Sequence, residues 1–234
     1  MSAKRASGSG RPPPLRQARV SYFWIAVSAL LAIAVVVGLL VAALGGDDSA
    51  SDALEVADAV TVTGGPLPVF EDPAADAAVG LPAPTVAGVD FDEVPVATPA
   101  PGAPYAVVLL AHWCPHCQAE VPRIVSLANS GGTSDVPVVA VSTAVDENQG
   151  NYPPSEWLER ENWPFPVVVD DADGTAASAY GLADFPMIVF VDGAGNVVAR
   201  VVGEVPEEEL ATMFAALAAG ESVPVSGEAP SSSG

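Results

Sequence analysis

The residues that could do chemistry are concentrated in one short stretch. Both cysteines and both histidines of this 234-residue chain lie within six positions, at His112, Cys114, His116 and Cys117. Two thiols separated by two residues can form and break a disulfide with each other, which is the chemistry of thiol–disulfide exchange. A disulfide across so short a loop would constrain the unfolded chain little, which favours redox work over a structural link.

The elements on either side of this stretch predict how the thiols are held. The apolar run 106–110 has the length and composition of a buried strand, and apolar residues then recur at helical spacing through Val121, Ile124 and Val125. We therefore expect Cys114 where a strand ends and a helix begins, with Pro115 in the first helical turn. Unpartnered amide groups and the positive end of the helix dipole stabilise a thiolate at such a position.

This arrangement predicts a division of labour between the sulfurs. Cys114 would be the exposed sulfur that attacks a partner, and Cys117, one turn later on the same face, the less exposed sulfur that resolves the mixed disulfide. A cationic His116 near Cys114 would stabilise the thiolate further and make the disulfide a stronger oxidant. A reduction potential as low as thioredoxin's, about −270 mV, would contradict that hypothesis.

A membrane anchor is predicted at the N-terminus. Residues 20–44 form an uncharged, mostly apolar run long enough to cross a bilayer. Five basic residues precede it and two aspartates follow closely, so we expect a single-pass protein of the cell membrane, with a cytoplasmic N-terminus and an extracytoplasmic catalytic domain. A cleaved secretory signal is the alternative, although its apolar core is usually shorter.

The charge distribution argues against nucleic-acid binding. All 29 acidic residues follow Gly46, where the only basic residues are Arg123, Arg160 and Arg200. So acidic a domain is repelled by phosphate backbones and by anionic lipid. We interpret the acidity as a source of solubility.

Composition and periodicity predict five segments. They are a cytoplasmic tail (1–19), the membrane span (20–44), an acidic, Pro- and Ala-rich linker (45–78), a folded domain (79–219) and a disordered tail (220–234). Within the folded domain the order is strand, helix, strand, helix, short strand, short helix, hairpin, helix. Such an order predicts an α/β fold with a mixed sheet covered on both faces.

A second informative stretch is Phe185-Pro186-Met187, which leads into the buried strand 188–191. Proline cannot donate a hydrogen bond to a strand ladder, so its place at the mouth of a strand predicts a special turn. A cis peptide bond is one form that such a turn takes.

Together these residues resemble a known family. The pattern Trp-Cys-x-x-Cys-x-x-Glu-x-Pro from Trp113 to Pro122, a single span before it and Phe185-Pro186 after it resemble the membrane-anchored TlpA/ResA-like thiol–disulfide oxidoreductases of bacteria. These belong to the redoxin superfamily, and the resemblance covers about residues 79–219. It implies a thioredoxin-like three-layer sandwich with a mixed central sheet, preceded here by one transmembrane helix.

The resemblance also implies roles for particular residues. Cys114 and Cys117 match the redox pair, Pro186 the family's cis-proline, which faces the pair and helps to present substrate backbone, and Glu120 the acid that tunes proton transfer. The implied partners are protein thiols and disulfides and a membrane redox protein that exchanges electrons. No cofactor is implied, because the cysteines carry the electrons.

Three departures from the family leave the direction of electron flow open. Val108 stands at a strand position that usually carries an acid, so Glu120 would act alone or be merely a helix acid. The Pro-His pair between the cysteines resembles the strongly oxidising DsbA enzymes rather than reductive members. Phe185 is bulkier than the residue usual before the proline.

The same residues are compatible with two other functions. A Cu(I) carrier could use both thiols with His112 and His116, although four ligands so close in sequence would unwind the helix start. A peroxiredoxin-like peroxidase would need a threonine where Ala111 stands. His112 could instead simply line the site.

Overall fold

The computed structural model describes residues 55–225. The predicted cytoplasmic tail, the predicted span and residues 226–234 lie outside this range. None of the helices in the described part has both the length and the apolar character needed to cross a bilayer.

A mixed five-stranded sheet forms the centre of the fold. Its strand order is β6 (Val167–Val169), β5 (Val138–Ser142), β4 (Tyr105–Leu110), β7 (Met187–Val191) and β8 (Val197–Val202). The pairs β4–β5 and β5–β6 are parallel, whereas β7 runs antiparallel to both β4 and β8. The predicted α/β fold with a mixed sheet is confirmed.

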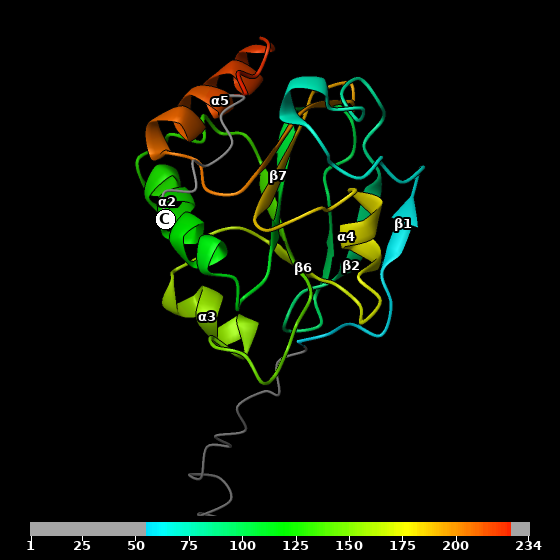
Figure 1. The fold of residues 1–234 in the computed structure, drawn as a ribbon, viewed down its shortest axis with the longest axis vertical. Coiled ribbons are helices and arrows are strands. Elements are labelled where there is room, and N and C mark those ends of the chain that lie inside the picture. Colours follow the sequence, from blue (N-terminus) through cyan, green and yellow to red (C-terminus); the bar gives the residue numbers. More distant parts are fainter. Residues whose placement is uncertain (1–54, 226–234) are drawn as a thin grey trace, which may run out of the picture. The chain divides into compact units, whose positions relative to one another are not determined.

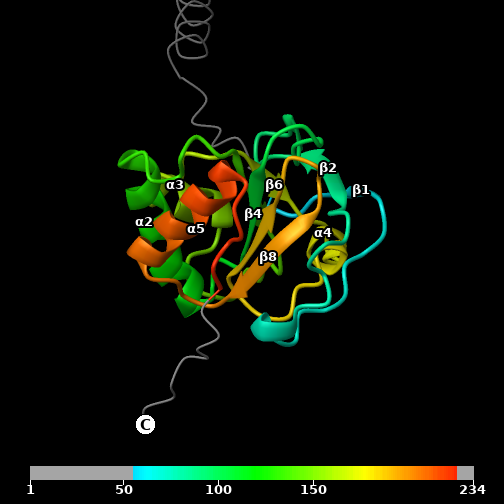
Figure 2. The same ribbon diagram turned by 90° about the horizontal axis from the view of Figure 1, so that it is seen from above.

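Alternation along the buried central strand β4 divides the core in two. Ala106, Val108 and Leu110 belong to one apolar cluster, with α2 (Pro115–Asn129), α3 (Pro154–Arg160) and α5 (Glu207–Ala219). Val107 and Leu109 belong to the other, with α4 (Thr175–Ala179) and a second, smaller sheet. Successive strand residues point to opposite faces, so one strand supplies both clusters. Figures 1 and 2 show these layers on either side of the central sheet.

The smaller sheet includes residues of the segment predicted to be a linker. It consists of β1 (Thr61–Thr63), β2 (Thr85–Val89) and β3 (Pro95–Ala97), all antiparallel. A short 3₁₀ helix, η1 (Pro73–Ala75), follows β1. The linker predicted at 45–78 therefore differs from the structure over its described part, where Ala57, Leu67 and Ala78 are buried. These apolar residues lack a regular period, so no pattern indicated that they pack.

A buried ion pair holds this N-terminal segment against the sheet. The Arg200 side chain on β8 donates to both carboxylate oxygens of Asp76, at 2.9 and 2.5 Å, and neither side chain is more than 3% exposed. Arg200 Nη1 also donates to the carbonyls of Pro68 and Tyr180, at 2.8 and 2.9 Å. Burial raises the pKa of Asp76, but the hydrogen bonds from Arg200 and Ala78 outweigh it and hold that pKa below its usual value.

Gly181 packs against the Pro68 carbonyl and the Arg200 side chain of this ion pair. Its φ is +67°, and a Cβ built there would lie 2.2 Å from the Pro68 carbonyl oxygen and 2.7 Å from Arg200 Nη1. Both the left-handed backbone and the lack of space require glycine.

Two further contacts involve the ends of the described chain. The helix α3 begins at Pro154, and the hydroxyl of its second residue, Ser155, donates to the Glu55 carboxylate. At the other end Val223, in the tail predicted from 220, is buried against the helical cluster.

Candidate active site

Cys114 occupies the junction between β4 and α2, as the sequence predicts. It is the residue that precedes α2, its backbone is extended, and Pro115 is the first residue of the helix. Pro115 needs no hydrogen-bond partner in the first turn, where the amide groups of a helix lack partners in any case. Cys114 therefore lies at the positive end of a 15-residue helix.

The two free thiols have different surroundings. Cys114 is 5% exposed and its Sγ donates to the Phe185 carbonyl at 3.7 Å. Cys117 is 0% exposed and its Sγ accepts from the Ala111 amide at 3.5 Å. Burial raises the pKa of the Cys117 thiol, and the neighbouring Cys114 adds to the rise. Cys114 is thus the more accessible of the two cysteines, but the prediction that it is exposed is wrong, because only 5% of the residue is accessible to solvent.

Phe185 and Pro186 bring the second informative stretch beside the thiols. The Phe185–Pro186 peptide bond is cis, and it leads directly into β7. The Phe185 ring meets the Trp113 indole edge to face, with centroids 5.9 Å apart. Trp113 is fixed in turn by its Nε1, which donates to the Ala144 carbonyl at 2.7 Å. Two aromatic side chains therefore flank the accessible sulfur.

Glu120 is the buried acid of the site. It is 0% exposed, and its Oε2 accepts from Arg123 Nη1 at 3.0 Å and from the Val205 amide at 3.1 Å. Its other oxygen, Oε1, is buried without a hydrogen-bond partner. Burial raises the pKa of Glu120 despite those two donors, and the charge of Glu120 contributes to the raised pKa of Cys117. Glu120 is therefore not a solvent-exposed acid on the helix surface.

His116 faces outward from the first turn of α2. Its side chain is 64% exposed, and Nδ1 lies 2.9 Å from Glu204 Oε1 on the segment between β8 and α5. Glu204 also accepts from Arg123 Nη2 at 2.7 Å. The histidine next to the thiols is therefore paired with a carboxylate.

Both ring nitrogens of His112 are engaged by backbone groups, so His112 has a supporting position in the site. It is 1% exposed, Nδ1 is 2.9 Å from the Gly150 carbonyl, and Nε2 accepts from the Asp146 amide at 3.2 Å. These contacts fit one neutral tautomer, whose N–H is on Nδ1. Its carbonyl accepts from Gln118 Nε2 at 3.1 Å. His112 thus holds the loop between β5 and α3 against the start of α2.

This geometry weakens both alternative functions. A copper site built on the thiols would lack His112 as a ligand, since both of its ring nitrogens are engaged. Across residues 55–225 no three His, Cys, Asp or Glu side chains converge as metal ligands would. At the position where a peroxidase needs a threonine hydroxyl, Ala111 supplies only a backbone amide, and it is bonded to Cys117.

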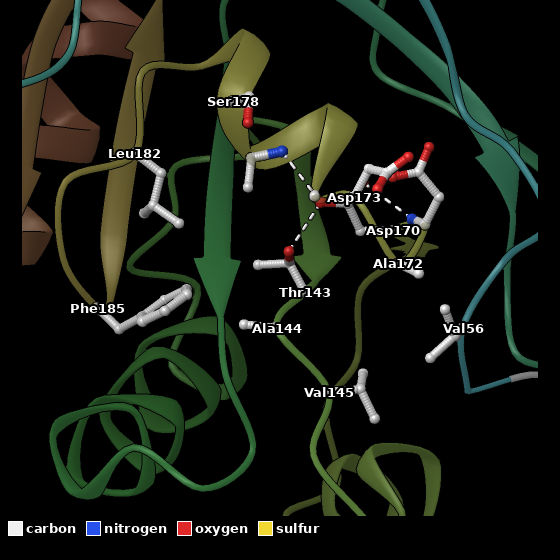
Figure 3. Close-up of a pocket in the computed structure, with 13 residues that line it drawn as sticks. Val56, Thr143, Ala144, Val145, Asp170, Ala172, Asp173, Ser178, Leu182 and Phe185 are labelled. Carbon is white, nitrogen blue, oxygen red and sulfur yellow. Dashed lines mark hydrogen bonds between the residues drawn. The ribbon is translucent and has the colours of Figure 1, made fainter.

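A hollow of about 450 Å³ shares two residues with the surroundings of the thiols (Figure 3). They are Phe185, whose carbonyl contacts Cys114 Sγ, and Ala144, whose carbonyl accepts from Trp113. Asp170 also lines the hollow, and its carboxylate accepts from the Thr143 hydroxyl at 2.7 Å and from the Ala176 and Ala177 amides of α4. Val56, from the N-terminal segment, lines the hollow opposite Phe185. The volume of the hollow is large enough for amino-acid side chains.

Sequence reasoning missed Glu204, Arg123 and the Ala144 carbonyl as parts of the site. Arg123 offered one signal, because it is one of three basic residues after Gly46 and lies three positions after Glu120. Side chains three apart on a helix are neighbours, so this pair could have been predicted. Glu204 and Ala144 are far away in sequence and gave no such signal.

Comparison with known families bears on this arrangement. The sequence model of the Redoxin family matches residues 78–217, more than half of the chain. That range contains both thiols, Glu120, Glu204 and the Phe185–Pro186 turn.

Curated relatives and solved structures agree with that match. The thiol:disulfide interchange protein DsbE of Pseudomonas aeruginosa is 27% identical over 117 residues, covering 48% of this chain and 61% of that protein. The protein of the same name from Pseudomonas fluorescens biotype C is 28% identical over 120 residues, covering 50% and 63%. This chain thus spans about three fifths of the length of these relatives. A thioredoxin family thiol:disulfide interchange protein of Chlorobium tepidum has the same fold, with a TM-score of 0.50 at 22% identity, covering 62% of this chain and 99% of that one.

Proposed function

Because this chain belongs to the Redoxin family, we propose that it is a thiol–disulfide oxidoreductase that exchanges disulfides with protein substrates through Cys114 and Cys117. One observation carries the proposal. Two free thiols lie one turn apart at the N-terminus of α2, one of them 5% exposed beside the Phe185–Pro186 turn and the other 0% exposed. A structural thiol pair has no need of that asymmetry, whereas exchange through a mixed disulfide requires it.

The exchange follows from the positions of the sulfurs. The Cys114 thiolate attacks one sulfur of a partner disulfide, whose S–S bond breaks as the Cys114–partner bond forms. The partner's other sulfur leaves as a thiolate and takes up a proton. Cys117 then loses its proton and attacks Cys114, which forms the Cys114–Cys117 disulfide and releases the partner's second thiol. Two electrons pass to the partner, and the reverse sequence oxidises a partner dithiol.

The second step needs a proton acceptor near Cys117. Its thiol is buried and its pKa is raised, so few Cys117 thiolates exist at neutral pH. Glu120 has one buried oxygen without a hydrogen-bond partner. A carboxylate whose pKa is raised toward neutrality is a suitable acceptor for that proton. We assign Glu120 this role.

Polypeptide substrates suit the surroundings of Cys114. Pro186 presents a turn whose preceding carbonyl already contacts the sulfur, so a substrate backbone can lie alongside it. Trp113 and Phe185 offer aromatic surface next to the reacting bond. The hollow beside Phe185 accepts side chains that flank the substrate cysteine.

The cellular setting belongs to the same proposal. The apolar run 20–44, with basic residues before it and acidic ones after it, supports a single-pass anchor with the catalytic domain outside the cytoplasmic membrane. A membrane redox protein would then restore the pair after each cycle. The reaction needs no cofactor, because the two sulfurs carry both electrons.

Two cysteine variants of the full-length chain test the function. Cys114→Ser should abolish reduction of a disulfide-bonded protein substrate by the reduced enzyme, because no accessible thiol remains. Cys117→Ser should instead accumulate a mixed disulfide visible on non-reducing gels, because the resolving thiol is gone. The proposal is wrong if Cys114→Ser exchanges disulfides at the wild-type rate, or if the wild-type thiols never form a disulfide in redox buffers.

A further inference from the structure

Four polar side chains form a continuous series of contacts beside the redox pair. His116 Nδ1 is 2.9 Å from Glu204 Oε1, Glu204 accepts from Arg123 Nη2 at 2.7 Å, and Arg123 Nη1 donates to Glu120 Oε2 at 3.0 Å. His116, Glu120 and Arg123 all come from α2, and only Glu204 comes from another element. Glu204 is therefore the one member that the helix itself does not position.

Glu120 also holds the backbone next to Glu204 in place. The amide of the next residue, Val205, donates to Glu120 Oε2 at 3.1 Å, and Val205 is buried in the helical cluster. Two consecutive residues thus contact the two ends of the series. The Glu204 side chain is 35% exposed, against 0% for Glu120, so the series runs from the surface into the core.

We infer that Glu204 sets the redox poise of the Cys114–Cys117 pair by placing a negative charge against His116 in the first turn of α2. The inference rests on the function proposed above. Only the reduced pair carries a thiolate, so a positive charge nearby favours the reduced form and makes the disulfide more oxidising. A carboxylate on His116 acts in the opposite direction. The Pro-His motif is thereby made less oxidising than it would be without Glu204.

The expected direction follows from the charge of Glu204. Glu204→Gln removes one negative charge beside the first turn of α2. The start of α2 therefore becomes more positive, so the thiolate gains stability. The hydrogen bonds from His116 and Arg123 keep the pKa of Glu204 below its ordinary value, so its charge is present at neutral pH.

The measurement is the reduction potential of the full-length protein, equilibrated with glutathione or dithiothreitol buffers at pH 7. Thiol alkylation followed by mass analysis gives the oxidised fraction. For Glu204→Gln we expect the equilibrium constant for reducing the pair to rise by three- to tenfold, where tenfold corresponds to about 30 mV. Glu204→Lys should move it further in the same direction. Glu204→Asp keeps the charge and should stay close to wild type.

A matched control separates this effect from a general loss of negative charge. Glu221 follows α5 and lines a hollow with Pro104, at the end of β4 that is remote from Cys114, and β4 is about 20 Å long. Glu221→Gln should leave the potential unchanged. Because exposed charges are screened, the difference between Glu204→Gln and wild type should shrink as salt is raised from about 0.01 to about 1 M.

The outcomes distinguish the inference from the function on which it rests. If the wild-type protein forms no reversible disulfide, the proposed function fails. If the wild type titrates normally but folded Gln and Lys variants keep its potential within twofold, or become more reducing, the inference alone is overturned. Circular dichroism melts establish which variants are folded, and the Lys variant decides the matter if the Gln variant is not.

Discussion

The buried pair of Asp76 and Arg200 gives a prediction whose size follows from the structure. Asp76→Asn removes the negative charge and leaves the guanidinium buried without a counter-ion, since both side chains are at most 3% exposed. Removing one partner of a buried ion pair costs about 3–5 kcal/mol. Asparagine keeps one acceptor oxygen, and Arg200 keeps its bonds to the carbonyls of Pro68 and Tyr180. We therefore expect the lower end, about 3 kcal/mol.

Urea unfolding followed by circular dichroism measures this loss. A domain of this size has a total stability of about 5–15 kcal/mol, so the change is a large shift in the midpoint. Asp92→Asn makes the same chemical change at an exposed position in the turn between β2 and β3, and should stay within about 0.5 kcal/mol of wild type. A loss below about 1 kcal/mol for Asp76→Asn would refute the argument that this pair holds residues 66–78 against the sheet.

The pH dependence of the same difference provides a second check. The pKa of Asp76 is lowered in the folded state, so its contribution is fully present above the unfolded value of about 3.9. It is lost as the pH falls through the folded pKa. Wild type and Asp76→Asn should therefore differ fully at pH 7 and converge in acid below about pH 4. A difference that stays constant down to the acid transition would contradict the charge assignment.

The other predictions concern catalysis. Glu120→Gln should slow the resolution of a preformed mixed disulfide at least tenfold in stopped-flow measurements, because Cys117 loses its proton acceptor, while the first attack by Cys114 keeps its rate. Equal slowing of both steps would assign Glu120 a structural role instead. Ala172→Trp should fill the hollow and lower kcat/KM for a protein substrate about tenfold, while reaction with dithiothreitol is unchanged. Ala194→Trp, in the exposed turn between β7 and β8, is the control, and equal losses in the two variants would show that the hollow binds no substrate.

Much of the fold could be predicted from the sequence because the central elements have strong periodicity. The run 106–110 and the helical spacing after Cys114 gave β4 and α2 nearly to the residue. Segments without a period were missed, and the packing of residues 57–78 is the main case. The strand Pro95–Ala97 also shows no period, since it is only three residues long and begins with a proline, so its pairing with β2 could not be predicted.

The same holds for the site, where only features with a local sequence pattern could be predicted. The thiols and Pro186 were found because their residue types and spacing define the chemistry. The burial of Cys114 and the backbone contacts of His112 could not be found, because they depend on loops that reach the site from more than 30 residues away. Glu204 is the sharpest example, since it meets His116 across 88 positions of sequence.

The close contact between Gly181 and the Pro68 carbonyl limits how the sequence of this protein can change in evolution. The Pro68 carbonyl leaves no space for a side chain there, and Arg200 occupies the rest of the gap. Neither of these two loop segments can change alone, so an insertion or a bulkier residue in one must be matched by a compensating change in the other. The stretch before the cis-proline is therefore tied in its evolutionary history to a segment more than a hundred residues upstream.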